Sequence, residues 1–238
     1  MSLTSIIALL QFTTILPLGR IREFGDFARH SWIYPIAGYV IGGMCACIVY
    51  FVGQPLVAAA LAIGVLFLIS GCNHLDGLMD FGDGLMAHGD MERRIRALTD
   101  RQIGTGGLAL ALSITLIAFS SLAASSCLIC ALVIAEVGAK FSMAFLSTFG
   151  KPFHEGLHAS IQGHSKPYFP LLAALLCLPL LLLPVPRIAL AAGAIVTVAC
   201  PIALLYISKR LFGGVNGDVV GACNEITRSL ILAALCLA

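Results

Sequence analysis

Long apolar stretches, separated by short polar loops, constrain this chain more than any other feature. Trp32–Val52, Gly104–Ser126 and Leu128–Phe149 each approach the ~20 apolar residues that a helix needs to cross a bilayer. Of the 238 residues, 59% are hydrophobic and 11% are charged, whereas soluble domains carry about 25% charged residues. The stretches are continuous rather than alternating, which argues against a transmembrane β-barrel. The sequence therefore predicts an all-α, polytopic integral membrane protein.

We expect about seven to eight transmembrane or membrane-embedded helices in one bundle, forming a single catalytic domain over residues 1–238. The further segments are Leu3–Leu18, Pro55–Met86, Pro170–Pro184, Ile188–Ile207 and Asp218–Ala238. The first is short for a span, so tilted, interfacial and re-entrant arrangements stay open. Pro55–Met86 is too long for one perpendicular span, and we expect this helix to continue towards the aqueous side. The pairs 104–126 with 128–149, and 170–184 with 188–207, are expected to form tight hairpins.

Positive charge is distributed unevenly between the loops. Eleven of the fourteen Lys and Arg residues lie in four loops, at 19–30, 88–103, 150–168 and 208–217. The joints near residues 53, 127 and 187 contain one, Arg187. Because Lys and Arg accumulate in cytoplasmic loops, we expect a protein of the cytoplasmic membrane whose charged loops, with the active site, face the cytoplasm. The net charge of +2 gives no indication of nucleic acid binding.

Three aspartates, Asp76, Asp80 and Asp83, follow the apolar run that ends at Ser70. At 100° per residue they fall within about 60° of one another on a helix. Ionisable groups at membrane depth line cavities, pair with other groups or do chemistry. Carboxylate oxygens suit hard cations such as Mg²⁺, so we predict that these aspartates bind divalent metal for phosphoryl chemistry. A proton or ion relay, or simple pairing with nearby arginines, stays open.

The spacing of the aspartates limits how an ion can be held. Asp76 and Asp83 are ~10 Å apart along a helix axis, which favours two ions with Asp80 central, or one ion with ligands from another helix. Gly77 and Gly84 flank the carboxylates. We expect them to remove side-chain bulk where a substrate phosphate approaches.

The segment after the aspartates combines arginines with glycines. Arg93 and Arg94 lie one short loop further on, and the turn at 104–107 reads GTGG. Arginine forks suit phosphates, and a glycine-rich turn that opens a helix offers backbone N–H groups to an anion. These features predict a phosphate contact, although cytoplasmic arginines can also serve only to set topology.

Charged residues inside later apolar segments need partners. Glu136 and Lys140 are four residues apart, which is typical of an i,i+4 pair, but Lys140 could also face a phosphate. Glu225 lies in the last helix, and we expect it to line a shared metal or ribose cavity. Asp218, at the start of that helix, is favoured there by the helix dipole.

Three motifs occur in order: HLDGLMDFGDGL at 74–85, ERRIRALTDRQIGTGG at 92–107 and GGVNGDVVGACNE at 213–225. Together they resemble cobalamin synthase, the adenosylcobinamide-GDP ribazoletransferase family. The stretches ALLQFTTILPLG and YPIAGYVIGG are also similar, so the resemblance covers most of the chain. Three departures occur: Thr99 stands where the family usually has Lys, Arg101-Gln102 replaces Ser-Arg, and Asn216 replaces Thr. We therefore expect the phosphate-binding arginine to be displaced by one position.

The resemblance implies a Mg²⁺-dependent enzyme that joins adenosylcobinamide-GDP to α-ribazole, or to α-ribazole 5′-phosphate, and releases GMP. It implies metal ligands at Asp76, Asp80, Asp83 and Asp218, a base at Asp83 or His74, and a leaving nucleotide held by Arg93 and Arg94. The expected substrate-binding residues are Asn73, Gly77, Gly84, Arg93, Arg94, Asp100, Arg101, Lys140, Asn216 and Glu225. Homo-oligomers, and docking of soluble enzymes of the pathway, are left open as partners beside the small-molecule substrates and the bilayer.

Two other classes of protein would use similar residues. A CDP-alcohol phosphatidyltransferase has the pattern D-G-x-x-A-R followed by G-x-x-x-D-x-x-x-D. Here Asp80-Phe81 stands in the Ala-Arg position and the second half is absent. A transporter also needs carboxylates in a membrane cavity, but these acids cluster beside an arginine-rich loop, and the chain has no internal repeat.

Overall fold

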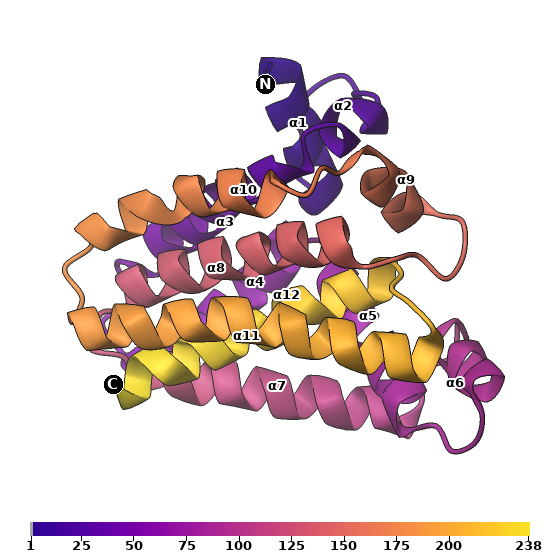
Figure 1. The fold of residues 1–238 in the computed structure, drawn as a ribbon. Coiled ribbons are helices and arrows are strands. Elements are labelled where there is room, and N and C mark those ends of the chain that lie inside the picture. The colour runs from indigo at the N-terminus through magenta and orange to yellow at the C-terminus, as the bar shows by residue number, and fades with distance from the viewer. Residues whose placement is uncertain (1) are drawn as a thin grey trace.

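The computed structural model describes residues 2–238, which form an all-helical bundle without named strands (Figure 1). The helices are α1 (Leu3–Thr13), α2 (Phe24–Ala28), η1 (Ser31–Ile33), α3 (Tyr34–Val49), α4 (Pro55–Ile69), α5 (Asn73–Met86), α6 (Met91–Leu98), α7 (Thr105–Ala123), α8 (Leu128–Phe149), α9 (Leu157–His164), α10 (Phe169–Cys177), η2 (Leu178–Leu182), α11 (Arg187–Phe212) and α12 (Gly217–Leu237). In this part of the chain, five helices are long and apolar enough to cross a membrane, or up to seven spans if each of two bent pairs counts as one. The predicted polytopic helical fold is confirmed.

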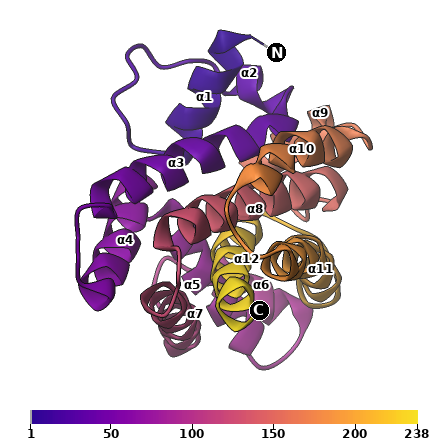
Figure 2. The same cartoon turned by 90° about the vertical axis from the view of Figure 1, so that its left-hand side faces the viewer.

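Helices α8 and α12 form the centre of the bundle. Most residues of α8 are buried, and it packs against α3, α10, α11 and α12. In turn, α12 contacts α5, α7, α8 and α11, and Figure 2 shows it enclosed by these helices when the bundle is seen from the end where the C-terminus lies. The last helix of the sequence is therefore a core element.

The contact between α3 and α8 depends on two glycines spaced as GxxxG. A Cβ on Gly38 would lie 2.6 Å from the Cα of Val137, and one on Gly42 would lie 3.1 Å from the carbonyl oxygen of Leu132. Small residues at this spacing let membrane helices approach backbone to backbone, which strengthens van der Waals packing where lipid leaves little hydrophobic drive between helices.

The expected continuous helix over Pro55–Met86 is wrong. The chain turns by 93° between α4 and α5. Gly71 and Cys72 both have positive φ, 62° and 59°, and the amide of Cys72 donates to the carbonyl of Phe67 at 2.9 Å while that of Gly71 donates to Leu68 at 3.1 Å. This pattern is a Schellman motif, which terminates α4. The aspartates therefore lie on a separate helix that starts in a new direction.

The two predicted hairpins are also wrong as packed pairs. A short connection, Ala124–Cys127, joins α7 to α8, but α7 packs more extensively on α4, α5 and α12 than on α8. Similarly, α10 and α11 each pack on α8 and make hardly any direct contact with one another. A short loop holds only the adjoining ends of two helices together. Which helices pack along the rest of their length depends on side chains throughout the bundle.

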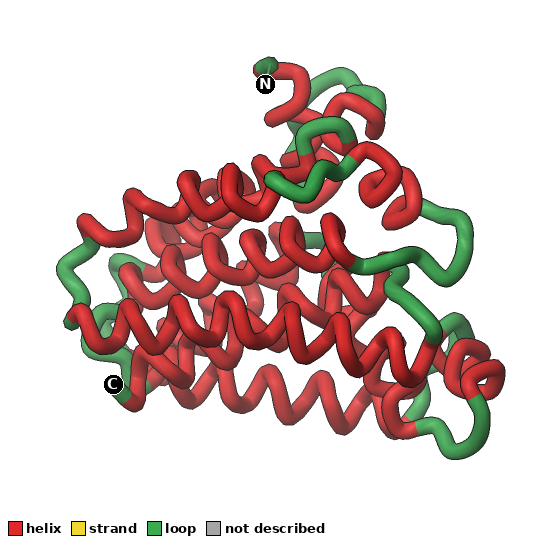
Figure 3. Tube along the Cα trace, viewed as in Figure 1, coloured by secondary structure: helices red, strands yellow, loops and turns green. Residues whose placement is uncertain are grey.

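Three of the four positively charged loops lie at one end of the bundle. The connections between α5 and α7, between α8 and α9, and between α11 and α12 all lie there, as the loops in Figure 3 show. The α7–α8 and α10–α11 connections lie at the opposite end (Figure 1). Three of the loops that are rich in Lys and Arg therefore lie at one end of the bundle, and two of the joints that are poor in them lie at the other.

The glycine contact makes a first prediction, with a matched control on the same helix. Gly38→Ala should lower the free energy of unfolding by about 1–3 kcal/mol, because the new Cβ meets backbone atoms that cannot move aside. Gly43→Ala should be neutral or slightly stabilising, since nothing lies within 4 Å of a Cβ at Gly43. Thermal unfolding of the detergent-purified protein measures both. Equal melting temperatures for the two variants would contradict the packing described.

Candidate active site at the contact of α5 and α12

Helices α5 and α12 touch backbone to backbone beside the aspartates. A Cβ on Gly77 would lie 2.8 Å from the carbonyl oxygen of Asp218 and 3.0 Å from its Cα. Asp218 lies in the first turn of α12, so this contact places it against the middle of α5. The carboxylate of Asp80 lies close enough to Asp218, Asp76 and Asp83 for their charges to act on it. The structure thus gathers the four predicted metal ligands around Asp80.

These four carboxylates form no ion pair with a Lys, Arg or His side chain within the described chain, although the charge of His154 acts on Asp218. Across residues 2–238, the ion pairs between side chains involve other acids. Asp76 is exposed, and Asp80, Asp83 and Asp218 are partly exposed. Neutralisation by nearby arginines, one of the alternatives left open by the sequence, is therefore not what the structure shows. Like charges gathered in this way call for a cation from solution.

The arrangement fits an open metal site rather than a closed one. In the described residues, no group of three or more His, Cys, Asp or Glu side chains could hold a metal ion by itself. Mg²⁺ is usually bound through one or two carboxylates, with waters and substrate phosphates as its other ligands. The four aspartates offer only oxygen donors, are at least partly exposed and form no ion pair within residues 2–238, so they match this requirement. Asp80, together with either Asp76 or Asp218, would supply the protein ligands of such an ion.

Asn216 caps α12 and orients Asp218. Its Oδ1 accepts a hydrogen bond from the amide of Val219 at 3.0 Å, and its Nδ2 donates to Oδ2 of Asp218 at 2.6 Å. The side chain is buried, and its contact with substrate stays a prediction. Asn is a preferred N-cap residue, and the sequence Asn-Gly-Asp before an apolar run is the signal that could have revealed this role.

Asp83 is the anion that occupies the glycine-rich turn. Its Oδ2 accepts a hydrogen bond from the amide of Gly104 at 2.7 Å, and its Oδ1 accepts one from Gly107 at 2.8 Å. These amides lie at the start of α7, where a negative charge is stabilised by unpaired N–H groups and the helix dipole. Two amides of the turn are therefore occupied by the protein itself, and a phosphate contact at Thr105 and Gly106, which line the neighbouring cavity, stays a prediction. A role for Asp83 as metal ligand or base stays a prediction. In either role its carboxylate would have to act while it accepts both of these hydrogen bonds.

Protein atoms occupy the space beside the two glycines that were predicted to make room for a phosphate. At Gly77, the backbone of Asp218 occupies the space that a side chain would need, as described above. A Cβ on Gly84 would lie 2.8 Å from the Cβ of Leu98 and 2.9 Å from Cε1 of Phe212. Both glycines are buried against protein, and their contact with substrate stays a prediction. They are small because helices α6, α11 and α12 approach α5 closely.

The arginines of the 88–103 loop differ in their contacts. The Nη1 of Arg94 donates to the carbonyl of Leu85 at 2.8 Å and to that of Gly84 at 3.3 Å. Arg94 therefore binds the end of α5, where unpaired carbonyls attract a cation. Arg93 and Arg101 are exposed, and no side-chain hydrogen bond or ion pair within residues 2–238 engages their guanidinium groups.

A cavity of about 280 Å³ opens between the end of α5, α6 and the start of α7. Asp83, Asp100, Gln102 and Thr105 are among the residues that line it. The Oδ1 of Asp100 accepts a hydrogen bond from the amide of Gln102 at 3.1 Å, which fixes the turn that follows α6. This polar cavity lies next to the aspartate face, and its volume approaches the 300–1,000 Å³ typical of small-molecule sites.

His74 faces away from the aspartates. It is buried, its Nδ1 has no hydrogen-bond partner, and the charges that act on it are those of Lys140 and Arg228. Six residues of helix separate it from Asp80, which places the two side chains about 120° apart around α5. The structure therefore does not bring His74 together with the aspartates, and its role as the base stays a prediction. Asn73, exposed at the start of α5, stays a predicted substrate contact.

Lys140 and Glu225 belong to a buried network that links α8 to α12. The Nζ of Lys140 donates to Oδ1 of Asn224 at 2.7 Å and lies 3.6 Å from Oε2 of Glu136. Arg228 bonds to Glu136 at 3.1 Å and forms an ion pair with Glu225. All four charged side chains are almost completely buried, so the structure does not bring Lys140 and Glu225 to the aspartate site, and their contacts with substrate stay predictions. The alternative of an i,i+4 pair between Glu136 and Lys140 is confirmed.

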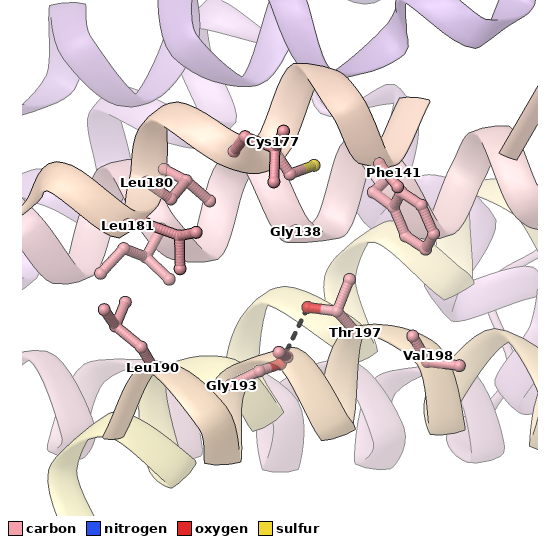
Figure 4. A pocket seen from close by; sticks show the side chains of 13 residues that line it. Gly138, Phe141, Cys177, Leu180, Leu181, Leu190, Gly193, Thr197 and Val198 are labelled. Atoms are coloured by element: carbon pink, nitrogen blue, oxygen red, sulfur yellow. Dashed lines mark hydrogen bonds between the residues drawn. The ribbon is translucent and has the colours of Figure 1, made fainter. Parts of the chain in front are cut away.

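An apolar groove lies elsewhere in the bundle, where α10 and α11 separate. It has a volume of about 230 Å³ and lies between η2, α8, α10 and α11 (Figure 4). Its most polar lining side chain, Thr197, donates its hydroxyl to the carbonyl of Gly193 at 2.8 Å. A groove lined in this way has no group that could bind a phosphate or activate a hydroxyl.

The fold and the site together define a polytopic membrane protein with an acidic site near its positively charged end. A family model for cobalamin-5-phosphate synthase matches residues 5–236. Relatives named adenosylcobinamide-GDP ribazoletransferase are 36% identical in Methanococcoides burtonii, over 95% of this chain and 89% of the relative, and 36% identical in Halorubrum lacusprofundi, over 98% and 97%. One from Deinococcus radiodurans is 35% identical, over 94% of this chain and 82% of the relative.

The chain therefore belongs to the cobalamin-5-phosphate synthase family, that of the adenosylcobinamide-GDP ribazoletransferases, and is an enzyme of cobalamin biosynthesis. The resemblance seen in the three sequence motifs is confirmed. Because the match extends over nearly the whole chain, it favours this family over the phosphatidyltransferases and transporters considered above. No solved structure matches the protein.

The hydrogen bonds of Asp83 predict that two neighbouring aspartates differ in their effect on stability. Asp83→Asn should lower the free energy of unfolding by about 1–3 kcal/mol, because an amide cannot accept hydrogen bonds at both of its polar atoms. Asp76→Asn, whose side chain is exposed, should not destabilise the protein. Melting temperatures in detergent test this. A stable Asp83→Asn variant would show that α7 does not need this contact.

The buried network predicts a rescue between two substitutions. Lys140→Met should destabilise the protein by about 3–5 kcal/mol, since it leaves an excess of buried negative charge. Adding Glu136→Gln restores the balance and should recover part of the loss. The free energies of both variants, measured by denaturant unfolding in mixed micelles, decide the matter. If the double variant were less stable than Lys140→Met by the full cost of Glu136→Gln, the two sites would be uncoupled.

Proposed function

We propose that the protein joins adenosylcobinamide-GDP to α-ribazole, or to α-ribazole 5′-phosphate, in a Mg²⁺-dependent reaction that releases GMP. The product is adenosylcobalamin or its 5′-phosphate. The observation that carries this proposal is the set of carboxylates around Asp80 that form no ion pair in the described residues, in a chain of this family. The names of the relatives supply the two substrates.

The reaction is a transfer between two oxygen atoms on phosphorus. A ribose hydroxyl of α-ribazole attacks the phosphorus that carries the cobinamide side chain. A new phosphorus–oxygen bond forms, the anhydride bond to the GMP phosphate breaks, and its electron pair leaves with GMP while the hydroxyl loses its proton. When bound, Mg²⁺ would offset the charge of the diphosphate and of the departing GMP.

The chain contributes the ligands and the position of the acceptor. Asp80 on α5, together with either Asp76 on the same helix or Asp218 on α12, would hold the ion, and the cap formed by Asn216 fixes the orientation of Asp218. Of the two predicted bases, Asp83 lies on the aspartate face and takes the hydroxyl proton in this proposal. Two amide hydrogen bonds hold its carboxylate in place.

The exposed arginines suit the nucleotide. Arg94 is bound to the end of α5, so in this proposal Arg93 and Arg101 provide the guanidinium groups for the GMP phosphate. The polar cavity between α5, α6 and α7 lies beside the aspartates and would receive part of the nucleotide. We further propose that the charged end of the bundle faces the cytoplasm across the cytoplasmic membrane, in line with the excess of Lys and Arg in its loops.

The test is GMP release by detergent-purified protein given adenosylcobinamide-GDP, α-ribazole and Mg²⁺. Asp80→Asn should reduce the rate at least about a hundredfold, the scale typical of losing a group that stabilises transition-state charge, without lowering the melting temperature. EDTA should abolish release in the wild-type protein. Glu23→Gln, which removes an exposed acid at the start of α2, serves as the control and should keep full activity.

Two results would contradict the proposal. Near-normal release by Asp80→Asn would remove the aspartates from the chemistry. Absence of GMP release by folded wild-type protein, with either α-ribazole or its 5′-phosphate as acceptor and phospholipid present, would show that the reaction itself is assigned wrongly.

A further inference from the structure

A second polar cavity lies at the base of two spans and shares no residue with the aspartate site. It has a volume of about 430 Å³, within the range typical of ligand sites. One wall comes from the end of α2 and from η1, and the other from the corner between α9 and α10. Its charged and aromatic lining residues are Arg29, His30, Trp32, His164, Lys166, Tyr168 and Phe169.

The lining of this cavity suits an anion. Arg29 and Lys166 carry positive charge, and no acidic residue is part of the lining. Arg29 forms one ion pair, with Asp26 at 3.1 Å, in which both side chains remain partly exposed. Lys166 is exposed and pairs with no acid in the described part of the chain. A weak surface ion pair of this kind leaves most of the positive charge available to a ligand.

Two histidines of the lining are oriented by backbone contacts. The Nδ1 of His30 lies 3.1 Å from the carbonyl oxygen of Asp26, and the Nδ1 of His164 lies 2.8 Å from that of Ser160. A carbonyl oxygen only accepts hydrogen bonds, so each Nδ1 carries the proton. The Nε2 atoms have no partner among residues 2–238, and a second proton on either ring would add a donor and a positive charge.

The two walls are joined directly, so the cavity is formed without a ligand. The hydroxyl groups of Ser31 and Ser165 are hydrogen bonded to each other at 3.2 Å, although the residues are far apart in the sequence. Ser31 is completely buried, and α10 packs against η1 beside it. A hydrogen bond of this kind between two elements helps to keep them in register.

The order of residues along the cavity distinguishes a lipid from a soluble anion. The spans Ser31–Val49 and Phe169–Leu182 both begin at this cavity. Arg29 and Lys166 precede those spans, whereas Trp32, Phe169 and Leu172 lie within their first turns. The cavity thus has a cationic rim above an apolar and aromatic wall. A phospholipid needs these two environments in the same order, the first for its phosphate and the second for its acyl chains. A soluble phosphate would need the rim alone.

We propose that this cavity binds the headgroup of an anionic glycerophospholipid. The lipid phosphate is held by Arg29 and Lys166, and the upper part of the acyl chains lies against Trp32 and Leu172. The bound lipid fills the gap between the N-terminal segment and the α9–α10 corner at the bilayer surface. The site is independent of the proposed reaction and has its own readout, because Trp32 is the single tryptophan of the chain.

The experiment uses that tryptophan as the probe of lipid occupancy. The full-length protein is reconstituted into phosphatidylcholine nanodiscs that contain a small, equal fraction of brominated-chain phosphatidylglycerol or brominated-chain phosphatidylcholine. Bromine quenches indole fluorescence on contact, so quenching of Trp32 reports which lipid occupies the cavity. We expect the brominated phosphatidylglycerol to quench at least about tenfold more effectively per mole, from two cations that each favour an anionic lipid.

Matched variants test whether the two cations are responsible. Arg29→Gln with Lys166→Gln should abolish the preference for phosphatidylglycerol. Lys209→Gln with Arg210→Gln, which removes two exposed cations at the end of α11, should keep it. Equal quenching by the two lipids in the wild-type protein would overturn the proposal, as would an unchanged preference in the first variant. Loss of the preference on adding millimolar inorganic phosphate, at constant ionic strength, would assign the cavity to a soluble anion instead.

Discussion

The backbone contact between Gly77 and Asp218 is the constraint on which the site depends. It brings the first turn of the last helix against the middle of α5, although some 140 residues separate them in the sequence. A side chain at position 77 would push α12 away and move Asp218 from Asp80. The cap by Asn216 then sets the direction of the Asp218 carboxylate. The acidic site is thus assembled by helix packing, and the carboxylates do not need a loop to bring them together.

The buried ions deeper in the bundle hold the same helix from its other side. Glu136 and Lys140 on α8 face Glu225 and Arg228 on α12, with two charges of each sign. Such a network is costly to bury, and breaking one partner costs more than replacing the whole set. Its effect here is to give α12 one register against α8. The close approach of α5 on one side and the ions on the other leave the start of α12 little freedom to move.

The sequence was sufficient for the helical class, the aspartate face and the family, because these depend on local pattern. Asp76, Asp80 and Asp83 share a face through the helix period alone. Packing partners depend on the whole bundle, so the sequence did not reveal that Gly77 and Gly84 are filled by protein, or that Lys140 is sealed inside. The bend before α5 had a local signal in Gly71, but the left-handed conformation of Cys72 carries no such mark in the sequence.

The central claim is that the carboxylates around Asp80 bind a divalent ion together with the substrate diphosphate. Titration with Mn²⁺, followed by electron paramagnetic resonance of the unbound ion, tests it on purified protein without any turnover. With adenosylcobinamide-GDP present and α-ribazole absent, the account predicts saturable Mn²⁺ binding that is much weaker without the nucleotide substrate and is lost in Asp80→Asn. Equal Mn²⁺ binding by wild-type protein and Asp80→Asn, with the substrate present, would contradict it.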